Sequence, residues 1–522
     1  MPDRKNNLKE LRSHPILTGT EAKRWEEGLL KDEAAEWAAM QRAGAAIARA
    51  IEEDFREIGG LPANARILVL MGKGHNGGDA VIAATHLLKS RPQARAVIDF
   101  CAREGSPRPL TMRAKREFVD TVGAQEELLI PGEEPDSSPF DLCLDGILGM
   151  QFRPPLDEFL SRKIAAINAH PNIRFRAAVD LPSGLGDESA QTVFRADFTY
   201  ATGIVKAPVV AEASAASVGR LRYLDLGFFS ESAPPSNAQV LTPQLLAPLA
   251  QLRPAQSDKR TFGHLFVLGG SHSYPGAVVM AVRGALHSGV GLVTAFVPEE
   301  LVPEYAAQHP EAMWVGCPVN SAGGHSPAAL TLLRSRLAQA DAFLIGPGLG
   351  ADAETLNLVA QLVAEVKVPF VLDADALRPE IIAAARGKPF IGTPHAGELQ
   401  RIAPALDEAS HGVIVRKGPL TSVVGRALCP TGAGDVGHKA RPTVYYSPFG
   451  GPVLARGGSG DILAGLIGGL LAQKPDDPLL AACRGVVWHG LAADLLARTH
   501  GQVAVETTQL LEQLGPALNS HP

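Results

Sequence analysis

Short apolar runs alternate with helical stretches along nearly the whole chain, and this alternation limits the folds that the sequence can adopt. In the first half the runs are RILVLM, RAVIDF, DLCLDGIL, FRAAVDLP and DFTYATGIV, and LRYLDLGF at residues 221–228 has the pattern of a closing strand. Two parallel strands need a crossover connection of about a dozen residues or more, so strands separated by helices pair in parallel. The sequence therefore predicts an α/β fold built on parallel sheets.

A segment rich in Ser, Pro and Ala at residues 230–243 separates this alternation from a second one. The second contains HLFVLGG, GLVTAFVP, AFLIGPG, PFVLDAD, PFIGTP, GVIVRKG and SVVG, and it ends in the helical stretches DILAGLIGGLLAQ and VVWHGLAADLLAR. Single cores stop growing at roughly 250–300 residues, and this chain has 522. We expect one domain at residues 1–230, where 21–58 form two helices or a broken one, a linker at 231–243 and a second domain at 244–522.

Charge and cysteine content give no indication of nucleic acid, a membrane or an oxidising compartment. The net charge is −6, no block of like charge is long enough to form a tail, and the five cysteines show no C-x-x-C pair. The start MPDRKNNLKELRSHP lacks the apolar region of a secretory signal, and the uncharged stretch at 261–282 is interrupted by Gly, Ser, His and Pro. We expect a cytoplasmic protein that acts on small molecules and binds neither nucleic acid nor a membrane.

The stretch GKGHNGGDA at residues 72–80 follows an apolar run and matches the glycine fingerprint of dinucleotide-binding folds. Asp99 ends the next run, at the distance where a ribose-binding acid is expected. Asn76 and Asp79 depart from the standard fingerprint, because they place an amide and a carboxylate within the turn itself. The fingerprint alone therefore leaves open whether the chain transfers hydride or binds a nucleotide for another purpose.

Two further acids end apolar runs, Asp145 in DLCLDGILG and Asp180 in AVDLPSG. The carboxyl ends of parallel strands share one edge of the sheet, where ligands bind, so both acids and Asp79 are expected in one crevice. Each acid alone could instead cap the helix that follows it. Together with Asn76 and Ser183 they form a set of hard oxygen donors, which suits a cation.

Four motifs in this half, GKGHNGGDA, DLCLDGILGMQFRPP, AVDLPSGLGD and TYATGIVKAP, resemble the epimerase domain of NAD(P)H-hydrate repair enzymes over residues 15–230. The resemblance implies a Rossmann-like three-layer fold that binds damaged nicotinamide cofactor as substrate, and it counts against hydride transfer. It implies that Asp180 is the general acid/base that inverts the hydroxyl-bearing carbon, with Lys206 as a second candidate in the same pocket. It also implies a potassium ion held by Asn76, Asp145 and Ser183. The substrate-binding residues that it implies are His75, Asn76, Gly77, Gly78, Asp79, Gly149, Met150, Gln151, Phe152, Arg153, Pro154, Pro155 and Asp180.

The stretch ARGGSGDILAGLIGGLL at residues 455–471 carries the strongest chemical signal in the second half. Its glycines open an apolar helix, so unpaired N–H groups and the positive end of the helix dipole face one point. Such a helix start stabilises phosphoryl oxygens, and Asp461 beside it can take a proton from a hydroxyl group. The alternative is a packing turn with Asp461 as a plain N-cap. A similar stretch, GAGD at 432–435, is followed by charged residues, glycine and proline, so we expect no helix there and an excursion at 426–449.

Ordered motifs in this half, FGHLFVLGGSHSYPGA, FLIGPGLG, VLDADAL, IGTPHAGEL and GGSGD, resemble the ADP-dependent NAD(P)H-hydrate dehydratase, which has a ribokinase-like fold, over residues 240–515. The resemblance implies that ADP, as co-substrate, phosphorylates the ring hydroxyl of the S-hydrate and that loss of phosphate restores the nicotinamide and leaves AMP. Magnesium is expected with the nucleotide, and Asp373 and Asp375 either assist it or merely end a strand. The implied hydrate-binding residues are Ala277, Gly348, His395 and Asp461, and the implied nucleotide-binding residues are Lys417, Gly418, Pro419, Leu420, Thr421 and Gly460.

The two halves together predict a bifunctional isomerase and lyase that epimerises R- and S-NAD(P)HX and dehydrates S-NAD(P)HX. Fusion of the two activities is sensible, because damage yields both epimers and dehydration accepts one. We also expect a homo-oligomer. The alternative is a ribokinase-type vitamin or sugar kinase with a non-catalytic nucleotide-sensing N-terminal domain, which His75 keeps open because the family usually has asparagine there.

Overall fold

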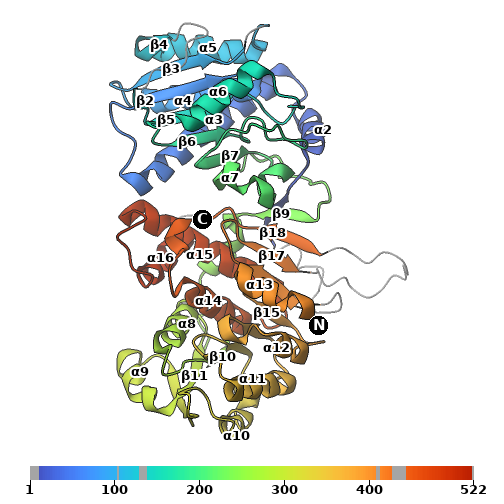
Figure 1. Cartoon of the computed structure of the whole chain (residues 1–522), viewed down its shortest axis with the longest axis vertical. Coiled ribbons are helices and arrows are strands. Elements are labelled where there is room, and N and C mark those ends of the chain that lie inside the picture. Colours follow the sequence, from blue (N-terminus) through green and yellow to red (C-terminus); the bar gives the residue numbers. More distant parts are fainter. Residues whose placement is uncertain (1–10, 103–104, 129–137, 407–411, 426–441, 520–522) are drawn as a thin grey trace, which may run out of the picture. The chain divides into compact units, whose positions relative to one another are not determined.

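The computed structural model describes residues 11–102, 105–128, 138–406, 412–425 and 442–519. The chain forms two compact units: residues 14–240 together with 497–502 make up an N-terminal unit, and the C-terminal unit is built around residues 241–496 and 503–522. Each unit contains one sheet with helices on its faces (Figure 1). The predicted α/β class is therefore confirmed.

The N-terminal sheet has the strand order β4-β3-β2-β5-β6-β7-β8, and all its neighbours pair in parallel. Six of its strands are those predicted, and the short β4 was not. Going outward from β2, the order matches that of dinucleotide-binding folds, in which the strand order reverses at a switch point. Here the switch point lies between β2 and β5. The strands are β2 (Arg66–Met71), β3 (Arg95–Phe100), β4 (Glu126–Leu128), β5 (Leu142–Gly146), β6 (Arg176–Val179), β7 (Phe198–Thr202) and β8 (Arg220–Leu224).

Helices cover both faces of this sheet, because successive side chains of a buried strand point to opposite sides. On β2, Ile67 and Val69 pack with the helices of one face, and Leu68 packs with α6 on the other. The three-layer prediction is thus confirmed, and so is the prediction of two helices within residues 21–58. The helices are α2 (Gly19–Leu29), α3 (Glu33–Phe55), α4 (His75–Lys89), α5 (Pro109–Val122), α6 (Glu158–Ala169) and α7 (Ala215–Val218).

Nine neighbouring strands of the 11-stranded sheet belong to the C-terminal unit and have the order β12-β11-β10-β13-β14-β15-β16-β17-β18. Pairing is parallel as far as β16, and β17 and β18 are antiparallel. The order repeats that of the N-terminal sheet, with a switch point between β10 and β13. The strands are β10 (His264–Leu268), β11 (Leu292–Pro298), β12 (Met313–Cys317), β13 (Ala342–Ile345), β14 (Phe370–Leu372), β15 (Phe390–Gly392), β16 (Gly412–Arg416), β17 (Ser422–Gly425) and β18 (Thr443–Tyr446).

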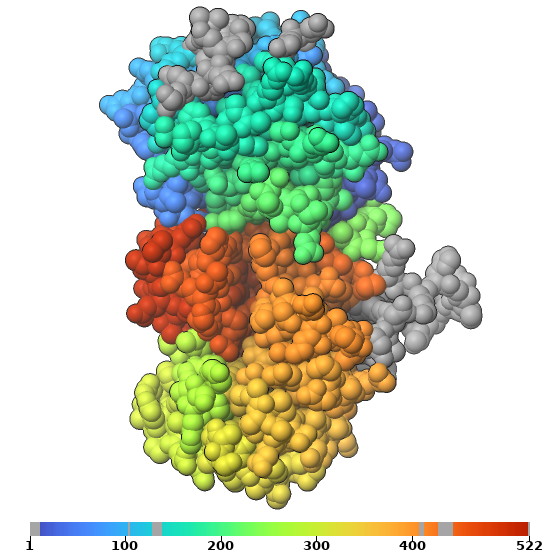
Figure 2. Space-filling view, in the orientation of Figure 1, coloured from blue at the N-terminus to red at the C-terminus, as the bar shows by residue number. Residues whose placement is uncertain are grey.

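The helices α10, α11 and α12 pack on one face of this sheet, and α8 and α14 pack together on the other. In the space-filling view α11 to α13, in yellow and orange, form much of the outer surface of this unit (Figure 2). Helix α15 has the length and composition of a membrane span, but 94% of its apolar window is buried, as in a core helix. The helices are α8 (Pro275–His287), α9 (Val302–Gln308), α10 (Ala329–Arg334), α11 (Ala353–Glu365), α12 (Pro379–Ala384), α13 (Ala396–Ile402), α14 (Ser459–Gln473), α15 (Pro478–His500) and α16 (Gln509–Asn519).

Two short strands lie where the sequence predicted no regular secondary structure. Strand β9 (Ala238–Leu241) lies within the segment 231–243, and a short β1 (Ser13–Pro15) precedes α2. The sequence predicted an excursion at 426–449. Its described part contains β18, which pairs with β17, and the GAGD stretch at 432–435 lies outside the described residues.

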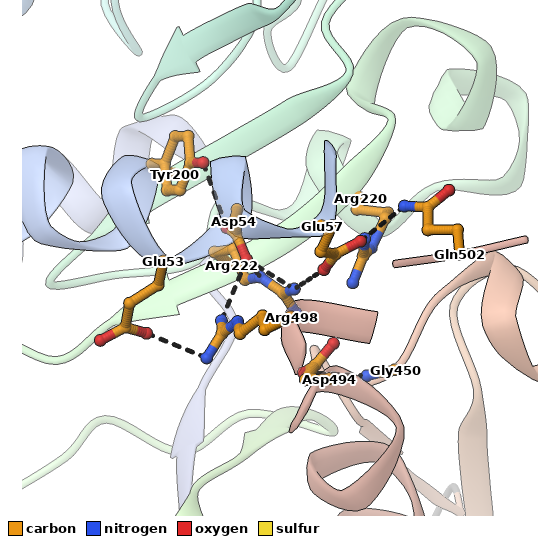
Figure 3. A network of polar contacts seen from close by, with 10 residues as sticks. All are labelled: Glu53, Asp54, Glu57, Tyr200, Arg220, Arg222, Gly450, Asp494, Arg498 and Gln502. Carbon is orange, nitrogen blue, oxygen red and sulfur yellow. Dashed lines mark hydrogen bonds and ion pairs between the residues drawn. The ribbon is translucent and has the colours of Figure 1, made fainter. Parts of the chain in front are cut away.

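The last turn of α15 belongs to the N-terminal unit, where a buried carboxylate holds it. Asp54 of α3 accepts hydrogen bonds from Arg222 Nη2 at 2.9 Å, from Arg498 Nη2 at 3.0 Å and from the Tyr200 hydroxyl at 3.1 Å (Figure 3). A buried carboxylate needs such partners, since an unpaired charge inside a protein is costly. Residues 497–502 are therefore part of the N-terminal fold, although some 250 residues separate them from the rest of it.

Candidate active sites

The glycine turn after β2 is shorter than its sequence suggested. Gly74 is the N-cap of α4, which begins at His75, so Asn76 lies in the first turn of the helix and Asp79 just after it, and neither lies in the preceding turn. A Cβ atom at Gly77 would lie 2.3 Å from the carbonyl oxygen of Gly72, so only glycine lets the helix start this close to the strand. The helix thereby brings an amide and a carboxylate to the switch point of the sheet.

The three residues predicted to hold a cation lie together beside this helix. Asp145 accepts hydrogen bonds from the hydroxyl of Ser183 at 2.6 Å and from its backbone N–H at 2.7 Å. Leu148 links them to Asn76, because its N–H donates to Ser183 Oγ and its carbonyl accepts from Asn76 Nδ2. The Asn76 side-chain oxygen faces Gly149, where a Cβ atom would lie 2.6 Å from it. Burial raises the pKa of Asp145 to about 6, although the bonds from Ser183 lower it.

Asp180, at the end of β6, is held in a strained conformation. Its φ of 68° lies in the left-handed region that residues other than glycine rarely adopt. The Lys206 ammonium donates to Asp180 Oδ1 at 2.6 Å, and the Thr202 N–H donates to the same oxygen at 3.3 Å. Such strain is often found at functional sites, where surrounding contacts keep a side chain in place. The carboxylate is therefore fixed in position next to a buried cation.

A cavity of about 270 Å³ joins these elements. Of the predicted epimerase residues, those that line it are His75, Asn76, Asp79, Gly149, Met150, Gln151, Asp180 and Lys206. Those that are not among its lining residues are Gly77, Gly78, Phe152, Arg153, Pro154 and Pro155. The sequence missed Glu26, Glu36, Arg108 and Phe228, which also line it, because none of them lies in a motif at the end of a strand. Thr202, another lining residue, lies in the motif TYATGIVKAP but was not singled out.

The cavity contains two carboxyl groups that burial holds towards the neutral form. Asp79 is 8% exposed, and its Oδ1 has no hydrogen-bond partner among the described residues. Burial raises the pKa of Asp79 well above its usual value, and nearby Asp180 and Glu26 raise it further. Burial also raises the pKa of Glu26 to about 7, although the Lys206 ammonium opposes this rise. An unpartnered buried oxygen at a cavity wall is positioned to bind a ligand.

The acids at this edge of the sheet do not act as helix caps, and Asp99, the acid expected to bind a ribose, is paired with a lysine. Asp157 caps α6, the helix after β5. Asp99 forms an ion pair of 2.5 Å with Lys163, and both side chains are buried. The alternative of simple capping for Asp79, Asp145 and Asp180 is therefore wrong, and Asp99 has a structural partner instead of a ligand.

In the C-terminal unit, α14 begins at Ser459, two residues before the position expected from the sequence. Gly458 is its N-cap, with a φ of 87° that glycine adopts without strain. Two contacts fix this helix start: Ser459 Oγ donates to Leu454 O at 2.7 Å, and His489 Nε2 donates to Ser459 O at 3.0 Å. Asp461 therefore lies in the first turn, and the interpretation of Asp461 as a plain N-cap is wrong.

Asp461 lies near two charged residues from the ends of parallel strands. Lys417, after β16, donates to Asp373 Oδ1, after β14, at 3.0 Å, and a Cβ atom at Gly460 would lie 3.2 Å from the Lys417 ammonium. Burial raises the pKa of Asp461 to about 7, and Asp373 adds to this rise while Lys417 opposes it. The arrangement places a carboxyl group that ionises near neutrality beside a partly buried cation and a helix N-terminus, which suits proton abstraction next to a phosphoryl group.

The residues predicted to bind the hydrate lie at the same carboxyl edge. Gly348 follows β13 with a φ of 68°, and a Cβ atom there would lie 3.1 Å from the Ala277 side chain. His395 follows β15 and is the N-cap of α13: its Nδ1 accepts from the Gly397 N–H at 3.1 Å. The imidazole of His395 is nevertheless 62% exposed, and its Nε2 lies 3.3 Å from Glu398 Oε1.

The residues expected to bind the nucleotide lie in a loop, and one acid expected near the metal accepts a backbone hydrogen bond. Lys417 and the residues up to Thr421 form the loop between β16 and β17. Asp375 Oδ2 accepts from the Gly350 N–H at 3.1 Å. Within the described part of the chain, no group of three or more His, Cys, Asp or Glu side chains is placed to hold a metal ion.

Comparisons with known proteins match both units. A family model described as NAD(P)H-hydrate dehydratase matches residues 265–516, and one described as YjeF-related protein N-terminus matches residues 37–207. The bifunctional NAD(P)H-hydrate repair enzyme of Gloeobacter violaceus is 35% identical over 92% of this chain and 93% of its own. That of Moorella thermoacetica is 33% identical over 91% of each. The Bacillus subtilis ADP/ATP-dependent NAD(P)H-hydrate dehydratase, crystallised with ATP/Mg²⁺, is 26% identical, with a TM-score of 0.42, over 54% of this chain and 98% of that one.

The two α/β units thus place acid–base groups at the switch point of one sheet and at a helix N-terminus beside the other. The chain belongs to the family of bifunctional NAD(P)H-hydrate repair enzymes. The resemblance that separate motifs indicated in each half is confirmed.

Proposed function

We propose that the two halves of this chain carry out successive steps in the repair of hydrated nicotinamide cofactor. Residues 1–230 interconvert the R- and S-hydrates, and residues 244–522 dehydrate the S-hydrate at the expense of ADP. The observation that carries the proposal is the partly buried carboxyl group of Asp461, in the first turn of α14 and close to the Lys417–Asp373 pair. Family membership supports an isomerase and a lyase in one chain.

In the dehydratase site, Asp461 accepts the proton of the ring hydroxyl, whose oxygen attacks the terminal phosphorus of ADP. Backbone N–H groups at the start of α14 and the Lys417 ammonium stabilise the charge on the phosphoryl oxygens. The C–O bond then breaks with phosphate as the leaving group while the electron pair of the ring nitrogen forms a C=N bond, and loss of a proton from the adjacent ring carbon restores the conjugated dihydronicotinamide. Phosphate leaves readily and hydroxide does not, which is why ADP is consumed. We assign the hydrate to Ala277, Gly348 and His395. Ala277 and Gly348 lie at the switch point and His395 lies at the same carboxyl edge of the sheet, which supports this role.

We assign the nucleotide to the loop from Lys417 to Thr421 and to Gly460. The closeness of Gly460 to the Lys417 ammonium supports a shared contact with its phosphates. Magnesium is usually bound by one or two carboxylates together with substrate phosphates. Asp373 is already paired with Lys417 and Asp375 accepts from Gly350, so in our proposal the nucleotide phosphates provide most of the magnesium ligands.

In the epimerase site, Asp180 acts as the base when the hydroxyl-bearing carbon is inverted. The Lys206 ammonium holds its carboxylate at 2.6 Å, and the strained backbone keeps it aimed at the cavity. His75, Asn76 and Asp79 at the start of α4 would contact the dinucleotide, because phosphates bind at helix N-termini.

Asn76, Asp145 and Ser183 fit a potassium ion. They offer an amide oxygen, a carboxylate and a hydroxyl, which are the hard donors that such a cation prefers. Burial raises the pKa of Asp145 to about 6, and a bound cation would favour its ionised form. The ion would supply positive charge next to the substrate. We expect epimerisation to be faster with K⁺ than with equal Na⁺, and Asp145→Asn to remove that difference, measured by the rate of epimer interconversion.

The rival proposal is a kinase that releases an intact phosphorylated product. Incubation with ADP and the S-hydrate decides between the two: repair yields NAD(P)H, seen by its absorbance, together with AMP and inorganic phosphate. Accumulation of a stable phosphorylated hydrate without NAD(P)H would favour the kinase. We further propose a cytoplasmic homo-oligomer, to be tested by light scattering of the purified chain and by cell fractionation.

A further inference from the structure

Glu26 of α2 is a carboxyl group in the epimerase cavity to which no motif of the sequence points. Its Oε1 lies 3.9 Å from the Lys206 ammonium, and the same ammonium lies 2.6 Å from Asp180 Oδ1. Both carboxyl groups line the cavity. The Lys206 ammonium therefore lies close to two carboxyl groups, one from α2 and one from the end of β6.

The fold fixes Glu26 in this position. Helix α2 begins with a capping box between Thr18 and Glu21, and Trp25, next to Glu26, donates from its indole to Phe228 O at 3.1 Å. The side chain of Glu26 is 22% exposed, whereas that of Glu27 is 64% exposed. Glu26 is thus part of the cavity wall and is not an ordinary surface charge.

Several charged groups from neighbouring elements share this cavity with Glu26. Burial raises the pKa of Glu26 to about 7, the Lys206 ammonium lowers it and Asp180 raises it. A carboxyl group in such surroundings exchanges protons near neutrality, which is the property of an efficient acid catalyst. The other titratable or charged groups that line the cavity are Lys23 and Glu27 of α2, Glu36 of α3, His75 and Asp79 of α4, and Arg108 before α5.

Inversion of the hydrate requires one acid and one base. Water adds to the enamine double bond of the reduced ring, so the hydroxyl-bearing carbon is bonded to the ring nitrogen. When the hydroxyl takes a proton, it leaves as water while the nitrogen electron pair forms a C=N bond. A water molecule then adds to the other face of the same carbon and loses one proton. One proton is given and one is taken, so the substrate keeps its composition and no oxidant or reductant is needed.

We propose that Glu26 is a further catalytic residue of this site: its carboxyl group protonates the departing hydroxyl, and Asp180 accepts the proton of the returning water. The Lys206 ammonium forms an ion pair of 2.6 Å with the carboxylate of Asp180. After each inversion the proton returns to Glu26 through Lys206 or solvent. The assignment rests on the proposed epimerase function of this half.

The test measures epimer interconversion by the full chain without ADP, so that the C-terminal half is idle. Epimers are separated by chromatography, and the uncatalysed rate is subtracted at each pH. We expect Glu26→Gln to lower kcat by about 100-fold, in the range of general acid catalysis, with KM changed less than threefold. Glu33→Gln, at an exposed glutamate outside the cavity, is the matched control and should react like the unsubstituted chain. Dehydration of the S-hydrate with ADP, which should stay unchanged, reports that the C-terminal half is intact, and thermal unfolding of each variant reports that the N-terminal half is folded.

The pH profile separates catalysis from a structural role. Because the acid form of Glu26 is required, kcat of the unsubstituted chain falls as the pH rises above about 7. Glu26→Asp should retain this falling limb, and Glu26→Gln should lose it. In H₂¹⁸O each inversion should introduce one labelled oxygen. Inversion without label, or a Glu26→Gln variant that matches the unsubstituted chain, would overturn the role of Glu26. If the unsubstituted chain does not interconvert the epimers at all, the proposed epimerase function itself fails.

Discussion

At the scale of single residues, the protein sets the protonation of its carboxyl groups mainly through burial. Asp461 and Glu26 both have pKa values raised to about 7, but the proposed chemistry uses them in opposite forms. Asp461 must lose its proton to act as a base, whereas Glu26 must keep it to act as an acid. The rates of epimerisation and of dehydration should therefore change with pH in opposite directions.

We predict that kcat/KM for ADP-dependent dehydration rises as the pH increases through about 7, because the pKa of Asp461 lies there and only its carboxylate accepts a proton. Asp461→Asn should lower the rate by at least 1,000-fold, near the upper part of the range for general-base catalysis of about 10²–10⁴. The measurement is NAD(P)H absorbance with S-hydrate and ADP over pH 5.5–9. A profile that falls with pH, or substantial activity in the asparagine variant, would contradict the assignment.

Asp180→Asn should slow recovery from the R-hydrate by about 100-fold or more, since the base of the inversion is lost. Recovery from the S-hydrate bypasses this site and should not change. Both rates are followed by absorbance in the same preparation, and each serves as the control for the other. Equal losses on both epimers would refute the proposed division of labour.

At the scale of elements, each site is positioned by a helix that starts directly after a glycine turn. The sequence identified both helices and the chemistry of their first turns, because glycine runs before an apolar stretch have few other uses. It did not identify where each helix begins. That depends on close approaches, such as the one between Gly77 and Gly72 or between Gly458 and Met280, which only packing in three dimensions defines.

Gly458→Ala should disrupt the start of α14. The residue has a φ of 87°, and a new Cβ atom would lie 2.0 Å from the sulfur of Met280, so we expect a loss of about 2 kcal/mol in stability and at least tenfold slower dehydration. Gly457→Ala is the matched control, because nothing lies within 4 Å of its new Cβ atom. Thermal unfolding and the dehydration rate of both variants are compared. Similar behaviour of the two would argue that the helix start does not depend on the left-handed glycine.

The sequence predicted the strand ends with carboxylates but missed the helical wall of the epimerase cavity. Asp145 and Asp180 were recognisable because the carboxyl ends of parallel strands meet. Glu26 and Arg108 lie in or beside surface-type helices with ordinary charge patterns, and only the packing of those helices brings them to the cavity. The short strands β4 and β12 were missed for a similar reason, since edge strands have weak apolar patterns.

At the scale of the whole molecule, the two sheets share one strand order, 3-2-1-4-5-6, in which both switch points carry predicted substrate contacts. The motifs gave no sign of this shared order, since strand order depends on the path of the chain in space. Nor did the sequence indicate that residues 497–502 complete the N-terminal unit. Arg498 and Gln502 bind Asp54 and Glu57 there, through ion pairs and hydrogen bonds that no local pattern encodes.

Arg498→Ala should destabilise the N-terminal unit by about 2 kcal/mol, because it removes a charged hydrogen bond to a buried carboxylate. Burial would raise the pKa of Asp54, but Arg222 and Arg498 outweigh it and hold that pKa below its usual value. The control is Arg162→Ala, whose arginine is 74% exposed and pairs with Glu158, and it should cost less than about 0.5 kcal/mol. Urea unfolding of the full chain measures both. Equal effects would show that Asp54 does not depend on the distant arginine.

The most direct test of repair by two successive activities uses an equal mixture of the R- and S-hydrates with ADP and magnesium. The account predicts that NAD(P)H absorbance recovers completely, that AMP and phosphate each form in equal amount to it, and that Asp180→Asn stops near half recovery on the same timescale. Recovery that ends near half with the unsubstituted chain, or a phosphorylated hydrate that accumulates in place of NAD(P)H, would contradict it.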